Sequence, residues 1–515
     1  MDMTEHQSSP KVRIGVIQST DSVEFHVNQN YELIDHAGQL VKAGQRNKKS
    51  RIEIESSQPA KIAYQIRLGK IALKADADSF LAAVKAKHIA ASARHIGEVL
   101  SFRDRTVDNR EYWITTGNYA TYEEAIEAQQ EFSDFEDNSI VEKLITNPSG
   151  TLRLDGVPLR NRVRIIPGKL VESRITIQNV IVGIEFHWQR LEAQEYRGII
   201  EIAFNNEGKL SVINEIDMEE YLISVNSSEM TPDCPMDLLK AQTIAARSTI
   251  LATMGKHHYS QPFHLCADDH CQCYRGTTYE SATSVQAVRE TAGETLFFGN
   301  QVCDARYAKI CGGVMESYEN VWEKKQIPYL RAGIDGDLEI ELPLNTEEKA
   351  RKFIDSNLPA YCNTDMYELP KMLEYSNHLF RWRVTHRREE LQDIIRSRSN
   401  EDIGQLLNIV PLKRGVSGRL MQIEIIGTKR RLTITRELAI RRILSRSHLY
   451  SSCFYIEKAL AEDGTIDAIT FVGAGWGHGV GLCQVGATIM AKKGFTYPQI
   501  LAHYYKDANL VKLYE

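Results

Sequence analysis

Cysteine and histidine gather near the middle of this chain of 515 residues. Cys266, His270, Cys271 and Cys273 lie within eight residues. Thiolate and imidazole are the soft ligands that zinc prefers in proteins. The spacing Cys-x3-His-Cys is not that of a zinc finger, and a disulfide in an oxidising compartment or plain buried thiols would account for the same residues. Nine cysteines in all are too few for a disulfide scaffold, and their odd number leaves at least one unpaired.

A second chemistry-bearing segment runs from Gly473 to Gln484, where five of twelve residues are glycine. Glycine at this density lets the backbone bend sharply and lie close to another strand or to a ligand. The segment is not a phosphate loop, because no Lys follows with P-loop spacing. It carries Trp476 and a polar pair, His478 and Gln484. A glycine-rich turn with a buried imidazole and a ligand-lining loop are both compatible with this pattern.

Glu229 comes just before a helix-breaking Thr-Pro, where a side chain can project into a cleft. Taken alone, it would be a solvated residue at the end of a helix predicted over Met218–Met230. The next helix is predicted from Pro235, with Asp233 as its N-cap. Small residues recur in that helix at intervals of three and four, which predicts close packing: Leu238, Ala241, Ala245, Thr249 and Ala252.

Other segments supply the elements that must position these groups. Alternating apolar and polar residues predict strands in Lys11–Gln45 and between Thr151 and Asn214. Between these two segments, residues 62–145 mix strands and helices. The further predicted helices are Ala77–Leu100, Ala120–Phe132, Leu391–Arg396, Arg436–Ile443 and Tyr497–Tyr505. The pattern as a whole predicts an α+β fold.

Composition excludes several classes of protein. The chain is 43% hydrophobic and 25% charged, as in an ordinary globular protein of two or three domains. A net charge of −6 gives no electrostatic case for binding nucleic acid or an anionic membrane. No stretch approaches the roughly 20 apolar residues of a transmembrane helix. Met1–Lys11 lacks an apolar h-region, so no signal peptide is visible.

Four segments, taken in order, resemble the SpoIID/LytB family, the stage II sporulation protein D group of peptidoglycan-acting proteins. They are Tyr196–Leu251, His264–Gly276, Asp304–Asp335 and Gly473–Tyr505. The resemblance extends from about Tyr196 to Glu515, and Lys11–Gln45 is similar to the usual first strands. The cysteine-bearing motifs at Cys311 and Cys483 are most similar to those of Bacteroidetes-type members. Some 25 residues around the predicted helix Ala120–Phe132 resemble half of a SPOR-type glycan-binding domain.

The resemblance implies an α+β fold with a strand-rich SpoIID-like core, a helical catalytic segment and an inserted α/β N-terminal region. We therefore divide the chain into four parts. Residues 1–50 are the first strands of the core and residues 51–150 the insertion. Residues 151–338 hold the candidate catalytic Glu and the Cys/His cluster, and residues 339–515 are the remainder of the core with the glycine-rich motif.

The family includes lytic transglycosylases, which cleave the MurNAc–GlcNAc bonds of glycan strands and leave 1,6-anhydro-MurNAc ends. This chemistry needs one carboxyl group, which first protonates the glycosidic oxygen and then takes the proton of the sugar's own 6-hydroxyl. A hydrolase would instead need a pair of carboxylates. Glu229, in its Ser-Ser-Glu-Met context, matches the family's catalytic position. The resemblance further implies that the substrate is glycan already stripped of its stem peptides.

The resemblance also implies which residues line the substrate groove: Lys240, Gln242, Arg247, Tyr307, Gly312, Gly313, Glu316, His478 and Gln484. Lys240 and Arg247 are seven residues apart and share a helix face, so they could line the groove or anchor Glu229. A salt-bridged helix surface would account for both equally well. Cys311 and Cys483 stand where many members carry Ser, so a hydroxyl role does not carry over to them.

Some family members bind zinc through the Cys/His region, which implies a structural zinc ion at Cys266, His270 and Cys271. Cys311, Cys273 or His264 could complete the four ligands. We expect no other cofactor.

An alternative from a different functional class is a non-catalytic enhancer that binds peptidoglycan and activates a cell-wall amidase, as the LytB branch is thought to do. The presence of Glu229 favours the enzyme, since a pure modifier has no need of it. A glycan-binding protein whose inserted domain holds the wall is a third possibility. The expected partners are glycan strands and an amidase. The family implies an extracytoplasmic location, in the periplasm or cell envelope.

Overall fold

The computed structural model describes residues 9–135, 137–183, 189–268, 270–337 and 339–515. Two sheets face each other in the N-terminal part. The first has the strand order β19-β1-β18-β17-β14-β3-β4 and the second has the order β13-β12-β5-β2-β15-β16. Side chains from both sheets, such as Val12, Phe25 and Ile200, are fully buried in one core.

The strands of these two sheets are β1 (Lys11–Thr20), β2 (Ser22–Val27), β3 (Tyr31–Asp35), β4 (Leu40–Gly44), β5 (Ser50–Gln58), β12 (Ser149–Leu154), β13 (Val157–Arg160), β14 (Arg162–Pro167), β15 (Ile175–Val182), β16 (Arg190–Tyr196), β17 (Ile199–Phe204), β18 (Leu210–Asp217) and β19 (Leu265–Cys266). In β14, Val163 and Ile165 are buried and their neighbours are more exposed. This alternation is what a sheet with one buried face requires. The strands predicted in these segments are confirmed.

The two facing sheets form a sandwich. A four-stranded antiparallel sheet is inserted into it, in the part of the chain between the paired strands β5 and β12. Its elements are β6 (Lys61–Ile71), α1 (Lys74–Ala86), β7 (Ala91–Ile96), the hairpin β8 (Val99–Ser101) and β9 (Thr106–Asp108), β10 (Glu111–Tyr119), α2 (Tyr122–Gln129) and β11 (Ser139–Thr146). The strand order β11-β6-β10-β7 and the two intervening helices give a ferredoxin-like βαββαβ arrangement.

Of the two helices predicted in the insertion, one is confirmed and the other is only partly correct. The predicted helix Ala120–Phe132 is confirmed: α2 and a following turn of 3₁₀ helix cover Tyr122–Phe132, and a capping box at Thr121 begins them. The prediction of one helix over Ala77–Leu100 is wrong in its second half. The chain reverses at His88, which has a positive φ of 61°, and then pairs as β7 with β10. Cross-strand pairing overrides the alanine-rich helical pattern there.

The central part is helical and holds α3 (Met218–Glu229), α4 (Met236–Thr253), α5 (Ala282–Glu290) and the short sheet β20 (Glu294–Phe298), β21 (Gln301–Val302) and β32 (Asn509–Lys512). Nearly all of α4 is buried, including the small residues predicted to pack closely. Asp233 does not cap this helix, contrary to prediction. Pro235, with φ −56° and ψ 141°, takes the N-cap position, and Asp233 accepts a hydrogen bond from Thr231.

A C-terminal lobe is built on two three-stranded sheets, β25-β30-β29 and β26-β27-β28. Its elements are α6 (Glu347–Ile354), β25 (Arg381–Arg387), α7 (Arg388–Ser399), β26 (Leu406–Arg414), β27 (Leu420–Gly427), β28 (Arg431–Thr435), α8 (Glu437–Ile443), β29 (Phe454–Leu460) and β30 (Ile466–Ala474). Both charged helices predicted in this region are confirmed, as α7 and α8.

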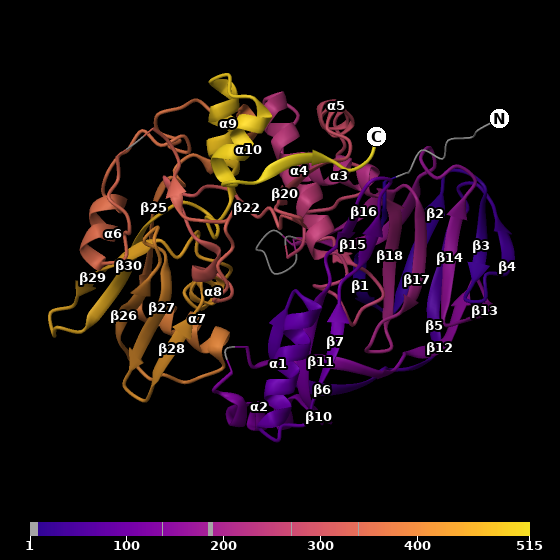
Figure 1. Cartoon of the computed structure of the whole chain (residues 1–515), viewed down its shortest axis with the longest axis horizontal. Coiled ribbons are helices and arrows are strands. Elements are labelled where there is room, and N and C mark those ends of the chain that lie inside the picture. Colours follow the sequence, from indigo (N-terminus) through magenta and orange to yellow (C-terminus); the bar gives the residue numbers. More distant parts are fainter. Residues whose placement is uncertain (1–8, 136, 184–188, 269, 338) are drawn as a thin grey trace.

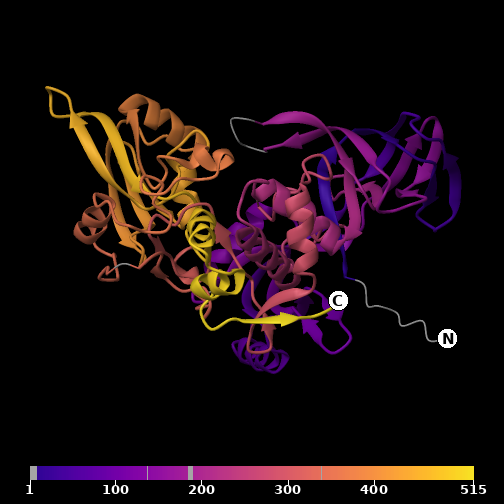
Figure 2. The same cartoon turned by 90° about the horizontal axis from the view of Figure 1, so that it is seen from above.

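The C-terminal tail returns to the central helices through α9 (Gln484–Lys492), α10 (Tyr497–Tyr504) and β32, which pairs with β20. Figures 1 and 2 show the sandwich and the C-terminal lobe on opposite sides of the molecule, with the central helices between them. The α+β fold class is confirmed. None of the helices in the described ranges is long and apolar enough to cross a membrane.

Candidate functional site

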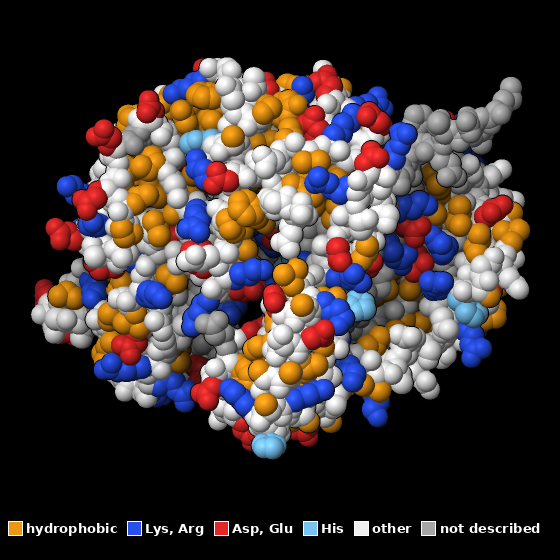
Figure 3. All heavy atoms as spheres, in the orientation of Figure 1, with side chains coloured by type: hydrophobic (Ala, Val, Ile, Leu, Met, Phe, Trp, Pro, Cys, Tyr) orange, Lys and Arg blue, Asp and Glu red, His pale blue; other side chains and the backbone are white. Residues whose placement is uncertain are grey.

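A cleft of about 1600 Å³ lies where the insertion, the central part and the C-terminal lobe meet. The residues lining it include Arg67, Lys70, Arg110 and Trp113 of the insertion, Ser228, Glu229, Lys256, Arg306 and Lys309 of the central part, and Arg436, Arg441, Tyr450 and Trp476 of the C-terminal lobe. Figure 3 shows the hollow between the lobes, with Lys and Arg side chains at its edge. Val180 and Gln194 of one of the two facing sheets also line it, so four parts of the fold contribute to one surface.

The glycine-rich segment forms part of the cleft wall because it lies directly against the segment that contains β22 (Tyr307–Ala308). Trp476 and Ile310 exchange backbone hydrogen bonds of 2.8 and 3.1 Å, and β31 (Leu482–Cys483) pairs in parallel with β22. Gly475 has a φ of +75°, and a β-carbon there would lie 2.6 Å from the Ile310 carbonyl oxygen. At Gly481 the corresponding distance, to the Arg306 carbonyl oxygen, is 2.0 Å. The close backbone approach predicted for this segment is made to another strand of the chain.

Glu229 is the last residue of α3 and lines the cleft together with Cys273, and its carboxylate is held by three hydrogen-bond donors. Oε1 accepts from the Tyr307 hydroxyl at 3.2 Å and from the Cys273 backbone N–H at 3.4 Å. Oε2 accepts from the Gln484 amide at 3.4 Å. The side chain remains partly exposed to the cleft. Three predicted site residues, Glu229, Tyr307 and Gln484, are therefore brought together.

Gln484 and Tyr307 are fixed by their own surroundings. The Gln484 amide also donates to Gln242 Oε1 at 3.3 Å, and Gln242 is fully buried behind it. Gln242 therefore supports Gln484 and does not line the cleft. Burial raises the pKa of Tyr307 well above its usual value, and the nearby Glu229 carboxylate raises it further. The Tyr307 hydroxyl consequently keeps its proton and remains a donor to Glu229.

His478 lines the cleft as predicted, with its ring edge-on to Trp322 at a centroid distance of 4.8 Å. Its Nδ1 accepts a hydrogen bond of 3.0 Å from the Val480 backbone. Burial lowers the pKa of His478 to about 3, and the positive charges of Arg306, Arg419 and Arg441 act in the same direction. The imidazole is therefore neutral at physiological pH.

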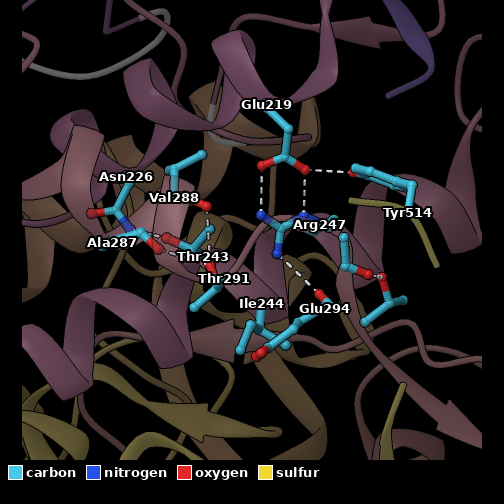
Figure 4. Close-up of polar contacts among 12 residues, drawn as sticks. Glu219, Asn226, Thr243, Ile244, Arg247, Ala287, Val288, Thr291, Glu294 and Tyr514 are labelled. Carbon is cyan, nitrogen blue, oxygen red and sulfur yellow. Dashed lines mark hydrogen bonds and ion pairs between the residues drawn. The ribbon is translucent and has the colours of Figure 1, made fainter. Parts of the chain in front are cut away.

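The predicted groove-lining role of Arg247 is corrected by the structure (Figure 4). Its side chain is fully buried and donates to both carboxylate oxygens of Glu219, at 2.8 and 2.6 Å, and to the Glu294 carbonyl at 2.9 Å. The Tyr514 hydroxyl donates to the same Glu219. Arg247 therefore joins α3, α4, β20 and the end of the chain, at a distance from the cleft wall.

Lys240 is likewise engaged elsewhere, in an ion pair of 2.6 Å with Glu290 of α5. It does not appear among the described residues that line the cleft. For both basic residues of α4, the salt-bridge interpretation of the sequence is the one that the structure supports.

Glu316, Gly312 and Gly313 are also removed from the predicted groove. The Glu316 carboxylate is fully buried and accepts hydrogen bonds from the Ser317 backbone, the Asn320 amide and the Ser417 hydroxyl, each at 2.8 Å. It thereby binds the loop that follows β26. Gly312 has a φ of +80° and lies against the Gly475 backbone nitrogen. These residues form the scaffold behind the cleft.

The Cys/His cluster is assembled from His258, Cys266, His270 and Cys271, whose ligand atoms all lie within 4.8 Å of one another. Cys271 Sγ is 3.4 Å from His258 Nε2 and 3.6 Å from His270 Nδ1, and Cys266 Sγ is 3.9 Å from His270 Nδ1. Two thiolates and two imidazoles are a donor set that zinc binds tetrahedrally. The three predicted ligands are together, and they fit a zinc ion.

The fourth member of this cluster was missed by the sequence prediction. His258 lies eight residues before Cys266 and has no spacing that marks it as a ligand. The suggestion of Cys311 is wrong, because Cys311 lies in a different buried cluster. His264 Nδ1 accepts a hydrogen bond from the Arg13 backbone, and the Cys273 backbone contacts Glu229. The Cys/His cluster thus lies two residues from a donor to Glu229.

Sequence reasoning also missed most of the aromatic and basic lining of the cleft. Tyr375 and Trp476 lie edge to face at a centroid distance of 6.1 Å, with Lys309 over the Tyr375 ring at 5.8 Å. Trp322 lines the same cleft, with Arg306 over its ring at 5.3 Å. Their positions depend on tertiary pairing between distant segments, so no local spacing could have revealed them.

Comparisons with known proteins match two separate parts of the chain. A family model described as stage II sporulation protein matches residues 206–298, and one described as a domain of unknown function (DUF8618) matches residues 316–481. An uncharacterized protein of Brachyspira hyodysenteriae is 28% identical over 354 residues, which cover 66% of this chain and 81% of that protein.

Two Bacillus relatives carry functional names. Stage II sporulation protein D of Bacillus amyloliquefaciens is 25% identical over 314 residues, covering 58% of this chain and 75% of that one. The amidase enhancer of Bacillus subtilis (strain 168) is 25% identical over 306 residues, covering 56% of this chain and 40% of the other. The part that supplies α3, α4 and Glu229 is thus a SpoIID-type domain. The family model and the named relatives together support a SpoIID/LytB assignment.

Proposed function

We propose that this protein acts on the bacterial cell wall as a peptidoglycan lytic transglycosylase, with Glu229 as the catalytic acid and base. The observation that carries the proposal is the position of the Glu229 carboxylate on the cleft wall, held by the donors of Tyr307, Cys273 and Gln484. A carboxyl group fixed in this way can be oriented toward a single glycosidic bond of a bound substrate. Orientation of this kind supplies much of an enzyme's rate enhancement.

In the proposed reaction, the protonated Glu229 carboxyl donates its proton to the glycosidic oxygen as the bond to C1 of MurNAc breaks. The resulting carboxylate then accepts the proton of the 6-hydroxyl as that oxygen forms a bond to C1. Electrons of the broken bond leave with the GlcNAc oxygen, and no water is consumed. Tyr307 and Gln484 donate hydrogen bonds that stabilise the carboxylate formed in the first half of this reaction.

The charge of the cleft fits an anionic glycan strand, and we propose a denuded strand on the strength of the family resemblance. A MurNAc residue without its stem peptide carries a free lactyl carboxylate, so such a strand has one negative charge for every disaccharide. The cleft presents Lys309, together with Arg306 and Lys256, which also pair with Asp304 and Glu111, and the exposed Tyr375 ring could contact the sugars. Opposite charges concentrated in a cleft favour both binding and rapid association.

We further propose that His258, Cys266, His270 and Cys271 bind one structural zinc ion. Zinc would supply no step of the reaction. It would fix the loop that ends at Cys273, whose backbone N–H donates to Glu229. Because the glycan lies outside the cytoplasm, we propose an extracytoplasmic location for the protein.

The amidase enhancer among its relatives supports a second candidate function, in which the same cleft binds glycan and the protein stimulates an amidase. The two functions are separated by incubating denuded glycan strands with the protein alone and identifying the products by mass spectrometry. New 1,6-anhydro-MurNAc ends would establish the transglycosylase. Intact strands, together with faster peptide release when an amidase is added, would establish the enhancer.

A further inference from the structure

A second set of metal-ligating side chains lies away from the cleft, at Cys311, Asp335, Cys362 and Cys483. All four residues are buried, and their ligand atoms lie within 4.8 Å of one another. They come from three distant parts of the chain: the segment around β22 to β24 (Gly333–Ile334), the stretch after α6, and the N-terminus of α9. None of these four residues is among the described residues that line the cleft.

The distances within the set are those of ligands around a single ion. Cys311 Sγ lies 3.6 Å from Cys362 Sγ and 3.1 Å from Asp335 Oδ2. Around a tetrahedral zinc ion with Zn–S bonds of about 2.3 Å, neighbouring sulfur atoms are about 3.8 Å apart. The observed arrangement needs only small side-chain movements to meet this geometry.

The surrounding groups are arranged to support anionic ligands. Cys483 is the N-cap of α9, and its Sγ accepts hydrogen bonds from the backbone N–H groups of Gly486 at 3.4 Å and Cys311 at 3.2 Å. A helix N-terminus stabilises a thiolate. Outer hydrogen bonds of this kind are typical of metal centres, because they orient the ligands.

Asp335 has the same kind of support. The Tyr504 hydroxyl donates to Oδ1 at 2.8 Å, and Oδ2 is directed at Cys311. The carboxylate is fully buried, and His503, at 3.5 Å, is its ion-pair partner among the described residues. A buried carboxylate is stabilised by a cation or by hydrogen bonds that replace its lost hydration. A metal ion would compensate Asp335 and the three sulfur atoms at once.

We propose that Cys311, Asp335, Cys362 and Cys483 bind a second zinc ion, which joins the glycine-rich segment and α9 to the scaffold behind the cleft. This site is structural and takes no part in the proton transfers assigned to Glu229. Since Gln484 follows Cys483 directly, the ion also fixes the residue that donates to Glu229. The competing arrangement is a disulfide between Cys311 and Cys362, which would leave Cys483 and Asp335 without a metal ion to bind.

The proposal is tested by counting zinc in the full-length protein, purified without chelators, by native mass spectrometry and metal analysis. We expect two zinc ions in the wild type and one in Cys271→Ser, which removes a ligand of the Cys/His cluster only. Cys483→Ser should also hold one, because a serine retains the N-cap of α9 while removing the thiolate. The double variant should hold none.

Cobalt provides a second readout that does not depend on activity. In the Cys271→Ser background, Co²⁺ should give the near-ultraviolet absorption of thiolate-to-cobalt charge transfer, and this band should disappear when Cys483→Ser is added. Circular dichroism of each variant checks that it has folded, and Asp335→Asn replaces any Cys483 variant that has not. A single zinc ion in the wild type that is lost in Cys271→Ser would overturn the proposal. A Cys311–Cys362 disulfide found by non-reducing peptide mapping would overturn it equally.

Discussion

The Gln484 amide donates a hydrogen bond of 3.4 Å to Glu229 Oε2, although 255 residues separate the two in the chain. Glu229 ends α3, and Gln484 begins α9. The contact exists because the C-terminal tail crosses back onto the central helices, where β32 pairs with β20. The candidate catalytic group is therefore completed only when the last part of the chain is in place.

Loss of this contact should slow the reaction without unfolding the protein. For Gln484→Leu we expect kcat on denuded strands to fall roughly 10- to 100-fold, because a hydrogen bond to a charged group is worth about 1.5–3 kcal/mol. Gln286→Leu is the control, since Gln286 is exposed on α5 and its side-chain amide donates to Glu290. Equal rates for the two variants would show that Gln484 does not act on Glu229.

The Tyr307 hydroxyl should matter to kcat more than to KM. Tyr307→Phe keeps the ring and removes the donor to Oε1, so we expect a loss of roughly tenfold in kcat. Tyr279→Phe, at an exposed position outside the cleft lining, should leave kcat unchanged. Steady-state kinetics that show a raised KM with normal kcat would instead assign Tyr307 to substrate binding.

Arg247 should prove to be a determinant of stability. Arg247→Met leaves the partly exposed Glu219 without its bidentate partner, and breaking a largely buried pair in this way costs up to about 3–5 kcal/mol. Urea unfolding should therefore shift to a lower midpoint than in Arg289→Met, which changes an exposed residue of α5. Unchanged stability combined with lost glycan binding would instead assign Arg247 to the substrate groove.

The lowered pKa of His478 predicts that the free energy of unfolding depends on pH. Its folded pKa of about 3 lies below the ordinary value of 6.5, so the unfolded chain takes up the proton first. The contribution of neutral His478 is therefore complete above about pH 6.5 and is lost as the pH falls, by at most about 1.4 kcal/mol for each pH unit. His478→Gln should show a shallower decline in unfolding free energy between about pH 6.5 and pH 4. Parallel declines would mean that the folded protein protonates His478 as readily as the unfolded chain does.

The Cys/His cluster should hold its zinc independently of other cysteines. We expect Cys271→Ser to lose one zinc ion and part of its activity, because the loop that presents the Cys273 N–H is no longer fixed. Cys234→Ser should keep the wild-type zinc content, since Cys234 Sγ contacts Thr231 instead. If activity survives complete loss of this zinc, the metal does not contribute to the positioning of Glu229.

Local sequence patterns predicted strands in the segments of the two facing sheets and most of the helices, but they did not predict α5, α6, α9 or the strands of the C-terminal lobe. The strands β14 and β17, and the helices α2, α3, α7 and α8, carry their periodicity in their own residues. The helix predicted to reach Leu100 ends early because β7 pairs with β10, an interaction that no local pattern contains.

Prediction of the site was uneven for a related reason. Motif resemblance singled out Glu229, Tyr307 and Gln484, which do meet. The same resemblance could not distinguish these residues from Arg247 and Glu316, whose side chains turn into the core. Whether a polar residue of a motif faces substrate or scaffold depends on how the elements pack, and that is decided by contacts across hundreds of residues.

The central claim is tested most directly by comparing wild type, Glu229→Gln and the exposed-surface control Glu348→Gln on denuded glycan strands, with the anhydro-muropeptides counted by mass spectrometry. An amide can neither donate a carboxyl proton nor accept one, so Glu229→Gln should lose about 10²- to 10⁴-fold in rate while keeping its fold and glycan binding. The control should cleave like the wild type. Release of 1,6-anhydro-MurNAc ends by Glu229→Gln at the wild-type rate would contradict the account.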